Sequence, residues 1–317
     1  LERLTMLVLT EGEAVLVVPE LEAPRVSPGA FEVRPWRETE DPVAVVASLA
    51  GGARSAAIGD ETWASFLLRL QDAMPDTVFG TASGLMRALR IRKDDDELTA
   101  LREAGHAVDR VVAALSAMEF AGKTERHLAR EVAAMAEAEG HDPLGFAIVA
   151  SGPNGASPHH EPTERVIARG DLVVVDFGGR RNGYCSDTTR TFSAGEPTAE
   201  QAAAFEVLAR AQAAAVEAVR PGIEAQHIDR VARAVIRDAG YGPRFIHRTG
   251  HGIGMDVHEH PYLVEGNDEP LEPGMAFSVE PGIYLAGEWG MRIEDIVCVT
   301  EDGVERLNRS ERILFRV

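Results

Sequence analysis

Apolar residues in the first part of the chain have the spacing of short strands and one helix. Two apolar runs within residues 4–18 flank Glu11-Gly-Glu13, a pattern typical of a hairpin. Short strands are predicted at Ser55–Ile58 and Thr77–Phe79, and Glu61–Met74 has the apolar spacing of a helix. These elements predict a small α/β domain. The charged stretch Arg90–Asp96 then separates it from the rest, so we expect domains at residues 1–93 and 94–317.

The rest of the chain alternates helical patterns with strand-like segments. Helices are predicted at residues 97–119 and 124–139, from a Thr198–Gln201 capping box to about Val219, and at 223–239. Four strand-like segments carry acidic residues. They are Leu172–Phe177, Tyr184–Thr189, Met275–Glu280 and Met291–Asp295.

Two parts of this region resemble each other at a spacing of 100 residues. Gly122, His127, Arg130, Gly140 and Pro143 recur as Gly222, His227, Arg230, Gly240 and Pro243. With a slightly different offset, Asp176 stands between Gly170 and Gly178 as Glu280 stands between Gly274 and Gly282, and Asp187 then corresponds to Glu294. Such self-similarity predicts a duplicated unit. We therefore expect two half-domains about a pseudo-twofold axis, each supplying two carboxylates.

The acidic residues of these segments, with one histidine, have the composition of a site for two divalent metal ions. A buried carboxylate needs a cation or a hydrogen-bond donor, and Asp176 and Glu280 follow runs that ought to be buried. Oxygen ligands suit hard cations, and manganese, cobalt, iron or zinc also accept imidazole. The candidate ligands are Asp176, Asp187, His251, Glu280 and Glu294. Two such ions can hold and activate a water, so the expected reaction is hydrolysis.

Composition limits the partners and the setting. With 51 acidic and 32 basic side chains the formal charge is -19, which disfavours nucleic acid and anionic membrane surfaces. No apolar run approaches the roughly 20 residues of a membrane span. Cys185 and Cys298 cannot form a disulfide framework, so we expect two buried thiols and a cytoplasmic protein. A strand begins almost at once after Leu1, so we expect the opening part of the N-terminal domain to be missing.

The strings around the candidate ligands resemble those of the pita-bread metallopeptidases, and most closely their proline-specific branch, the Xaa-Pro dipeptidases (prolidases) and Xaa-Pro aminopeptidases. The resemblance covers about residues 94 to 317. The matching strings are Asp176-Phe-Gly-Gly, Ser186-Asp-Thr-Thr-Arg-Thr191, Thr249-Gly-His-Gly-Ile-Gly254, Asp256-Val-His-Glu259, Ser278-Val-Glu-Pro-Gly282 and Gly290-Met-Arg-Ile-Glu-Asp295. It implies an α+β pita-bread domain with duplicated halves, preceded by a small creatinase-like α/β domain.

The resemblance also implies roles for individual residues. All five candidate ligands would bind metal, with Mn²⁺ the expected ion and Co²⁺ or Zn²⁺ the alternatives. His159 and His258 would shuttle protons and hold the substrate carbonyl, and Glu280 is the candidate acceptor of the proton from water. His247 would line the substrate pocket. Independently of the resemblance, Arg292 stands two residues before Glu294 and is expected on the same strand face, where its guanidinium could hold metal-bound carboxylates in orientation. It is also the second candidate substrate-binding residue.

The expected activity is cleavage of the bond preceding proline in short peptides, by a protein that we expect to be a homodimer. A dipeptidase must bind the free carboxylate beyond proline, for which some prolidases carry an arginine shortly after the Val-His-Glu string. This chain has Tyr262 in that region, although the short spacing from Glu280 to Glu294 resembles prolidases. An Xaa-Pro dipeptidase is therefore expected, with an Xaa-Pro aminopeptidase as the alternative. A methionine aminopeptidase, a non-catalytic peptide-binding module and a metal-free creatinase-like amidinohydrolase fit the strings and ligands less well.

Overall fold

A computed structural model describes residues 3–27, 29–143 and 146–317 of the chain. The chain divides into two compact units, Leu1–Met86 and Arg87–Val317. Among the described residues, no helix combines the length and the apolar composition that crossing a bilayer requires.

The first unit is the small α/β structure that the apolar spacing predicts. Its strands β1 (Met6–Leu9) and β2 (Ala14–Pro19) form the expected antiparallel hairpin, and β3 (Glu32–Trp36) pairs with β2 in parallel. A second, parallel pair joins β4 (Ser55–Ile58) to β5 (Val78–Thr81). The helical elements are η1 (Ala23–Arg25), α1 (Pro42–Leu49) and α2 (Ala64–Ala73), and α3 (Ser83–Arg90) runs from this unit into the second. Val17, Trp36 and Leu70 are among the buried residues of its core.

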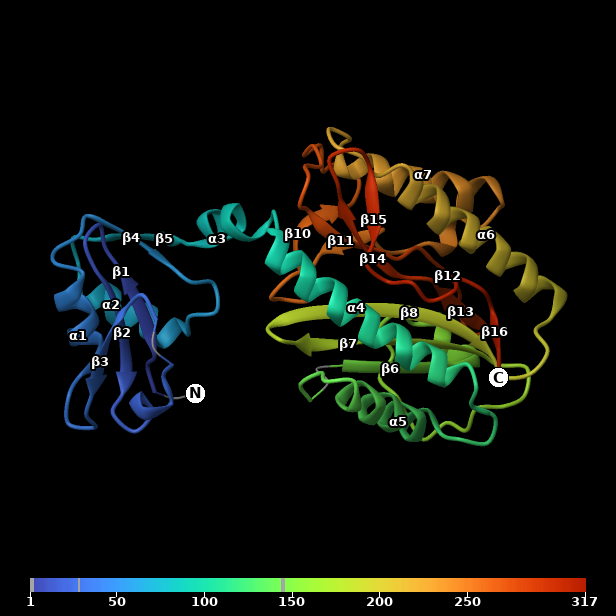
Figure 1. Cartoon of the computed structure of the whole chain (residues 1–317), viewed down its shortest axis with the longest axis horizontal. Helices are drawn as coiled ribbons and strands as arrows, with labels where there is room; N and C mark the ends of the chain where they lie inside the picture. Colours follow the sequence, from blue (N-terminus) through green and yellow to red (C-terminus); the bar gives the residue numbers. More distant parts are fainter. Residues whose placement is uncertain (1–2, 28, 144–145) are drawn as a thin grey trace. The chain divides into compact units, whose positions relative to one another are not determined.

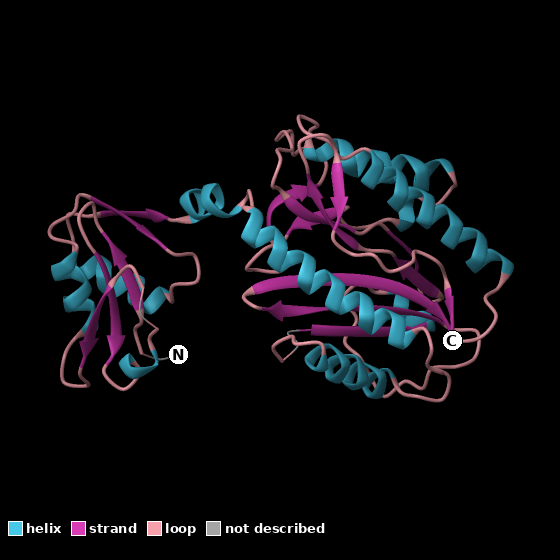
Figure 2. Ribbon diagram, viewed as in Figure 1, coloured by secondary structure: helices cyan, strands magenta, loops and turns pink. Residues whose placement is uncertain are grey.

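The second unit contains the four predicted long helices. These are α4 (Asp95–Leu115), α5 (Glu125–Ala138), α6 (Ala199–Glu217) and α7 (Ala225–Asp238). The Thr198–Gln201 capping box forms as predicted, and Asp94 and Glu97 form another at the start of α4. Figure 2 shows these helices outside the strands of this unit. Two short 3-10 turns, η2 (Gly152–Ala156) and η3 (Gly242–Arg244), lie in the connections.

Two larger sheets and one hairpin form the inner layer of the second unit (Figure 1). In the first half, β6 (Phe146–Ser151), β7 (Leu172–Arg181), β8 (Tyr184–Ser193) and β16 (Phe315–Arg316) are arranged as β16-β8-β7-β6. The second half contains β9 (Gly250–Gly252), β10 (Glu259–Leu263), β11 (Ala276–Val279), β14 (Asp295–Val299) and β15 (Val304–Arg306), in the order β10-β9-β11-β14-β15. The hairpin pairs β12 (Gly282–Leu285) with β13 (Trp289–Arg292).

The predicted duplication is confirmed by hydrogen bonds that recur in both halves. Gly122 donates its N–H to the carbonyl of Ile167, and Gly222 donates to Leu271 in the same way. Both glycines have positive φ, 87° and 81°, where a side chain would be strained. Helices α5 and α7 also begin and end at residues that lie 100 positions apart. The two halves therefore share backbone hydrogen bonds and helix boundaries as well as a residue pattern.

The carboxylates occupy different positions relative to the strands in the two halves. This corrects the expectation that all four lie within strands. Asp176 and Asp187 do lie inside the long hairpin of β7 and β8, but Glu280 follows the end of β11 and Glu294 precedes β14. Pro281 has no N–H for a strand ladder, so the second hairpin is interrupted after Glu280. Glu294 leaves its own hairpin and donates its N–H to the carbonyl of Thr189, on β8 of the first half.

The last residues of the chain complete the sheet of the first half. Strand β16 pairs in parallel with β8, with Phe315 opposite Phe192. The rings of these two residues stack with centroids 5.3 Å apart, and the N–H of Val317 donates to the carbonyl of Ser193. The first half is therefore built from two segments that are far apart in the sequence.

Candidate metal centre

All the candidate site residues named from the sequence line one cavity of about 760 Å³ in the second unit. Asp176 comes from β7, Asp187 from β8 and His251 from β9, while Glu280 and Glu294 come from the strand junctions described above. Both halves of the duplicated unit thus contribute carboxylates to the same cavity.

The candidate ligands converge on one another. The Nε2 atom of His251 lies 3.3 Å from Glu280 Oε1 and 3.6 Å from Asp187 Oδ2. One ligand atom each from Asp187, His251 and Glu294 lie within 4.8 Å of one another, and all three residues are buried. These separations are in the range that a shared cation would bridge.

The protonation of His251 shows what this cluster needs. Its Nδ1 atom lies 3.1 Å from the carbonyl of Gly252, an acceptor, so Nδ1 carries the proton. Burial, followed by the charge of His258, lowers the pKa of His251 to about 3, so the ring is neutral. Its Nε2 lone pair then faces carboxylate oxygens, which are also acceptors. A cation between them satisfies both sides, as in a metal-bound histidine held by a carbonyl.

The carboxylates show the same need for positive charge. Asp176 Oδ1 and Asp187 Oδ1 are buried and have no hydrogen-bond partner among the described residues. Burial, and then repulsion from neighbouring carboxylates, raises the pKa of Asp187 and of Glu294 well above the usual range. Such unpaired buried oxygens are unfavourable unless a cation compensates them. The set of four carboxylates and one imidazole therefore fits two divalent ions.

Arg292 links the carboxylates of the two halves. The guanidinium is buried, donates from Nη2 to Asp176 Oδ2 at 2.7 Å, and donates from Nε to Thr189 Oγ1 at 3.0 Å. The Thr189 hydroxyl in turn donates to Glu294 Oε2 at 2.7 Å. The sequence predicts Arg292 and Glu294 on one strand face, but β13 ends at Arg292, so the two residues do not share a strand. Arg292 instead reaches Glu294 through Thr189.

A tyrosine that sequence reasoning misses connects Arg292 to His247. Tyr284 OH accepts from Arg292 Nη1 at 2.8 Å and lies 2.8 Å from His247 Nε2. Since His247 Nδ1 faces the carbonyl of Arg248, Nε2 is the acceptor and the tyrosine donates to it. Burial, followed by the charge of Arg292, lowers the pKa of His247 to about 3. Tyr284 stands among the apolar residues of β12, where a tyrosine is indistinguishable from a core residue in the sequence.

The remaining cavity wall combines histidines with apolar side chains. The ring of His258 lies edge-on to that of His251, with centroids 4.1 Å apart, and burial lowers its pKa. His159 lines the cavity from the loop after η2. Phe146, Ile148 and Val257 supply apolar surface. This is a surface on which a small apolar ring can pack.

Residues of the loop around His159 donate hydrogen bonds to the buried carboxylate of Glu125. Glu125 is fully buried and accepts hydrogen bonds from Ser151, Asn154 and Thr163. It also lies 3.0 Å from Nε2 of His160. Burial acts to raise the pKa of Glu125, but these hydrogen bonds lower it from 4.5 to about 2.

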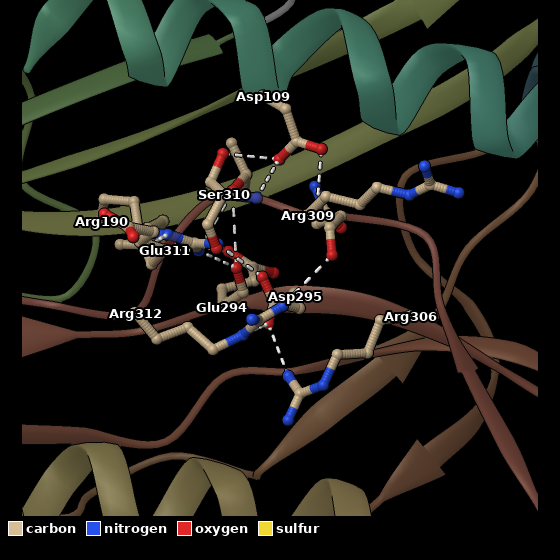
Figure 3. A network of polar contacts seen from close by, with 12 residues as sticks. Asp109, Arg190, Glu294, Asp295, Arg306, Arg309, Ser310, Glu311 and Arg312 are labelled. Atoms are coloured by element: carbon tan, nitrogen blue, oxygen red, sulfur yellow. Dashed lines mark hydrogen bonds and ion pairs between the residues drawn. The ribbon is translucent and has the colours of Figure 1, made fainter.

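A second buried carboxylate holds the backbone at Glu294 (Figure 3). Asp295 is fully buried and accepts from Arg190 Nη2 at 2.6 Å, Arg306 Nη1 at 2.8 Å and Arg312 Nε. Arg190 also donates from Nη1 to the carbonyl of Glu294 at 2.5 Å. The charges of the arginines outweigh burial and lower the pKa of Asp295. This network keeps Glu294 in place where it lies outside a strand.

Comparison with known proteins places the chain among metallopeptidases. Residues 99–301 match metallopeptidase family M24, and residues 1–92 match the creatinase/prolidase N-terminal domain. The probable dipeptidase PepE of Mycobacterium tuberculosis is 47% identical over 324 residues, which cover 100% of this chain and 86% of that protein. The Xaa-Pro dipeptidase of Pyrococcus furiosus is 39% identical over 238 residues, 75% of this chain and 68% of that protein.

A solved structure agrees with these sequence matches. The recombinant prolidase of Thermococcus sibiricus has a TM-score of 0.95 and 39% identity, covering 100% of this chain and 88% of that one. Its similarity extends over both units of the fold, and family M24 is metal-dependent. The buried ligand cluster, the duplicated second unit and these matches agree that the chain belongs to metallopeptidase family M24.

Proposed function

We propose that this protein is a dinuclear metal-dependent Xaa-Pro dipeptidase, which hydrolyses the peptide bond preceding proline. The observation that carries the proposal is the buried cluster of four carboxylates and His251 in a cavity with an apolar wall. Relatives named Xaa-Pro dipeptidase and prolidase support the choice of substrate.

Asp176, Asp187, His251, Glu280 and Glu294 would hold the two divalent ions. Mn²⁺ is the proposed ion, with Co²⁺ or Zn²⁺ as alternatives. Bound there, the ions supply an activated water and polarise the scissile carbonyl. Arg292 keeps Asp176 and, through Thr189, Glu294 in orientation.

The chain's own residues then handle protons and position the substrate. Glu280 has a side chain 16% exposed, against 6% for Asp187, so it is the ligand best placed to accept a proton from the cavity. His258 is proposed to donate to the oxygen of the scissile carbonyl as negative charge develops there. His159 holds the substrate and passes the proton accepted by Glu280 to the proline nitrogen as the carbon–nitrogen bond breaks, so that proline leaves as the free amine. The proline ring packs on Phe146, Ile148 and Val257, beside His247.

A comparison of three peptides tests this function. The full-length protein, stripped of metal and reloaded separately with Mn²⁺, Co²⁺ or Zn²⁺, is assayed with Ala-Pro, Ala-Pro-Ala and Met-Ala-Ser. We expect fast release of proline from Ala-Pro, with the highest rate in Mn²⁺. Cleavage of Met-Ala-Ser alone would overturn the proline specificity, and no cleavage of any peptide would overturn the enzyme.

The same assay separates the alternative, an Xaa-Pro aminopeptidase. Tyr262, in the region where some prolidases have an arginine, favours this alternative because tyrosine offers no positive charge to a free carboxylate. An aminopeptidase would cleave Ala-Pro-Ala at least as well as Ala-Pro.

We further propose a cytoplasmic homodimer with domains at residues 1–93 and 94–317. Two units meeting at Met86 and Arg87, and family matches at 1–92 and 99–301, support a boundary in this stretch. Sedimentation velocity tests the dimer, and limited proteolysis with mass spectrometry tests the boundary. A monomer, or cleavage that spares residues 87–98, would contradict these two proposals respectively.

A further inference from the structure

We propose that Arg248 binds the free carboxylate of the substrate's proline and thereby restricts the enzyme to dipeptides. This inference rests on the proposed function, because it names the group that recognises the end of the substrate. It concerns a residue outside the metal ligands and outside the histidines discussed above.

Arg248 stands out among the cavity residues by its free charge. It lines the cavity next to His247 and is half-buried. Its guanidinium has no acidic partner and no hydrogen bond within residues 3–27, 29–143 and 146–317. Arg292, which also lines the cavity, has each of its guanidinium nitrogens engaged by Asp176, Tyr284 or Thr189. Arg248 is therefore the guanidinium in this cavity that remains available to a ligand.

Tyr262 holds the guanidinium in a defined orientation. The Cζ atom of Arg248 lies 4.3 Å from the centroid of the Tyr262 ring. A guanidinium that rests on an aromatic ring keeps its N–H donors at the edge, where they can bind both oxygens of a carboxylate. Tyr262 pairs with the ligand His251 across β10 and β9, so the guanidinium is fixed one strand away from the metal centre. The tyrosine thus acts as a support for the arginine that binds the carboxylate.

Arg248 shares its cavity with the reacting side. It lines the same cavity as His258, the histidine proposed to face the scissile carbonyl. In a dipeptide, the carboxylate follows this carbonyl by a single proline residue, so both groups fit into one cavity.

The charge balance of the cavity leaves Arg248 as the cation that a substrate carboxylate can use. The four negative charges of the metal-binding carboxylates match the four positive charges of the two proposed ions, and Arg292 is engaged by Asp176. Arg248 is the positive charge left over among the described residues of the cavity. A longer peptide presents a neutral amide to Arg248, so it leaves the guanidinium without its partner. Charge-assisted hydrogen bonds of this kind change binding by about 10- to 100-fold.

Matched substrates with and without the carboxylate test the proposal. The metal-loaded full-length enzyme is assayed with Ala-Pro and with Ala-Pro amide, which differ only in that group. We expect wild-type kcat/KM to favour Ala-Pro by about 10- to 100-fold. Arg248→Met, which keeps an unbranched side chain on Tyr262, should lose this preference by weakening Ala-Pro alone, and Arg248→Lys should retain part of it. Arg244→Met, at an exposed arginine four residues earlier, is the control and should behave as wild type.

Binding of the product gives a readout that needs no turnover. Calorimetry with L-proline and L-prolinamide should show the same preference for the carboxylate in wild type and its loss in Arg248→Met. Equal binding of the two ligands by wild type, or an equal loss for both substrates in Arg248→Met, would show that Arg248 only packs on Tyr262 and would overturn the proposal. Carboxylate-selective binding without cleavage of Ala-Pro would instead overturn the proposed function and support the role of Arg248.

Discussion

Replacing Glu125 with glutamine removes a buried charge without changing the size of the side chain. Glu125 receives hydrogen bonds from the backbone N–H and hydroxyl of Ser151 at 2.8 Å, and from the hydroxyl of Thr163 at 2.7 Å. All of these groups are donors. A glutamine amide turns its own N–H donors towards some of them, so at least one buried donor loses its partner.

The pKa of Glu125 gives the size of the effect. A fall from 4.5 to about 2 corresponds to about 3 kcal/mol of stabilisation at pH 7. Because the folded pKa is depressed, this stability is fully present above about pH 4.5 and is lost as the pH falls towards 2. The difference between wild type and Glu125→Gln should therefore be constant from pH 7 to about pH 5 and shrink below it.

Urea unfolding at several pH values, followed by circular dichroism, measures this difference. Glu119→Gln is the matched control, since Glu119 is exposed and its pair with Arg169 lies at the surface, where the expected change is below about 0.5 kcal/mol. Glu125→Gln should also lower turnover, because the loop that it fastens carries His159. A variant as stable as wild type at pH 7, or a difference that grows on acidification, would refute this reasoning.

Further predictions concern the metal centre. Asp187→Ala should abolish cleavage of Ala-Pro and lower bound metal in elemental analysis, with an unchanged circular dichroism spectrum; full activity would remove Asp187 from the ligand set. His258→Ala should lower kcat by about 100-fold or more but keep its metal, and loss of metal would make it a ligand instead. Tyr284→Phe should lower activity or the affinity for metal by about 10- to 100-fold, because it removes the hydroxyl that connects Arg292 to His247. A variant that binds Mn²⁺ and cleaves substrate like wild type would contradict this. Chelation should lower the thermal midpoint, since ions at 100 times their Kd add about 2.7 kcal/mol, and an unchanged midpoint would argue against tight binding.

Sequence patterns predict the elements whose residues repeat regularly. The capping box at Thr198 and the duplicated glycines lead directly to the helices and turns of the second unit. Helix α1 is not predicted, because its Val-rich sequence has the composition of a strand and tertiary contacts outweigh that preference. The Asp41-Pro42 pair at its start, an N-cap followed by proline, is the local signal that could have identified it.

The candidate site is predictable as a set of residues but not as a network. Spacing and motif strings identify the ligands and the histidines of the cavity, but not Phe146, Ile148 or Arg248, which line it as well. The hydrogen bonds that connect the site residues depend on which side chains face each other in the folded protein. Thr189 and Tyr284 lie 105 and 8 residues from the partners that give them their roles, Glu294 and Arg292. No local pattern reveals such pairs.

The tail strand β16 has a consequence for how this protein is made. During synthesis, the sheet of β6, β7 and β8 keeps the edge of β8 open until residues 315 and 316 leave the ribosome, because within the described part of the chain these are the residues that pair with that part of the edge. The first half cannot finish folding ahead of the second, even though its other strands are made earlier. The two duplicated halves therefore complete their folding together. A fragment that ends before β16 would leave this edge of β8 unpaired, so other chains could pair with it and aggregate.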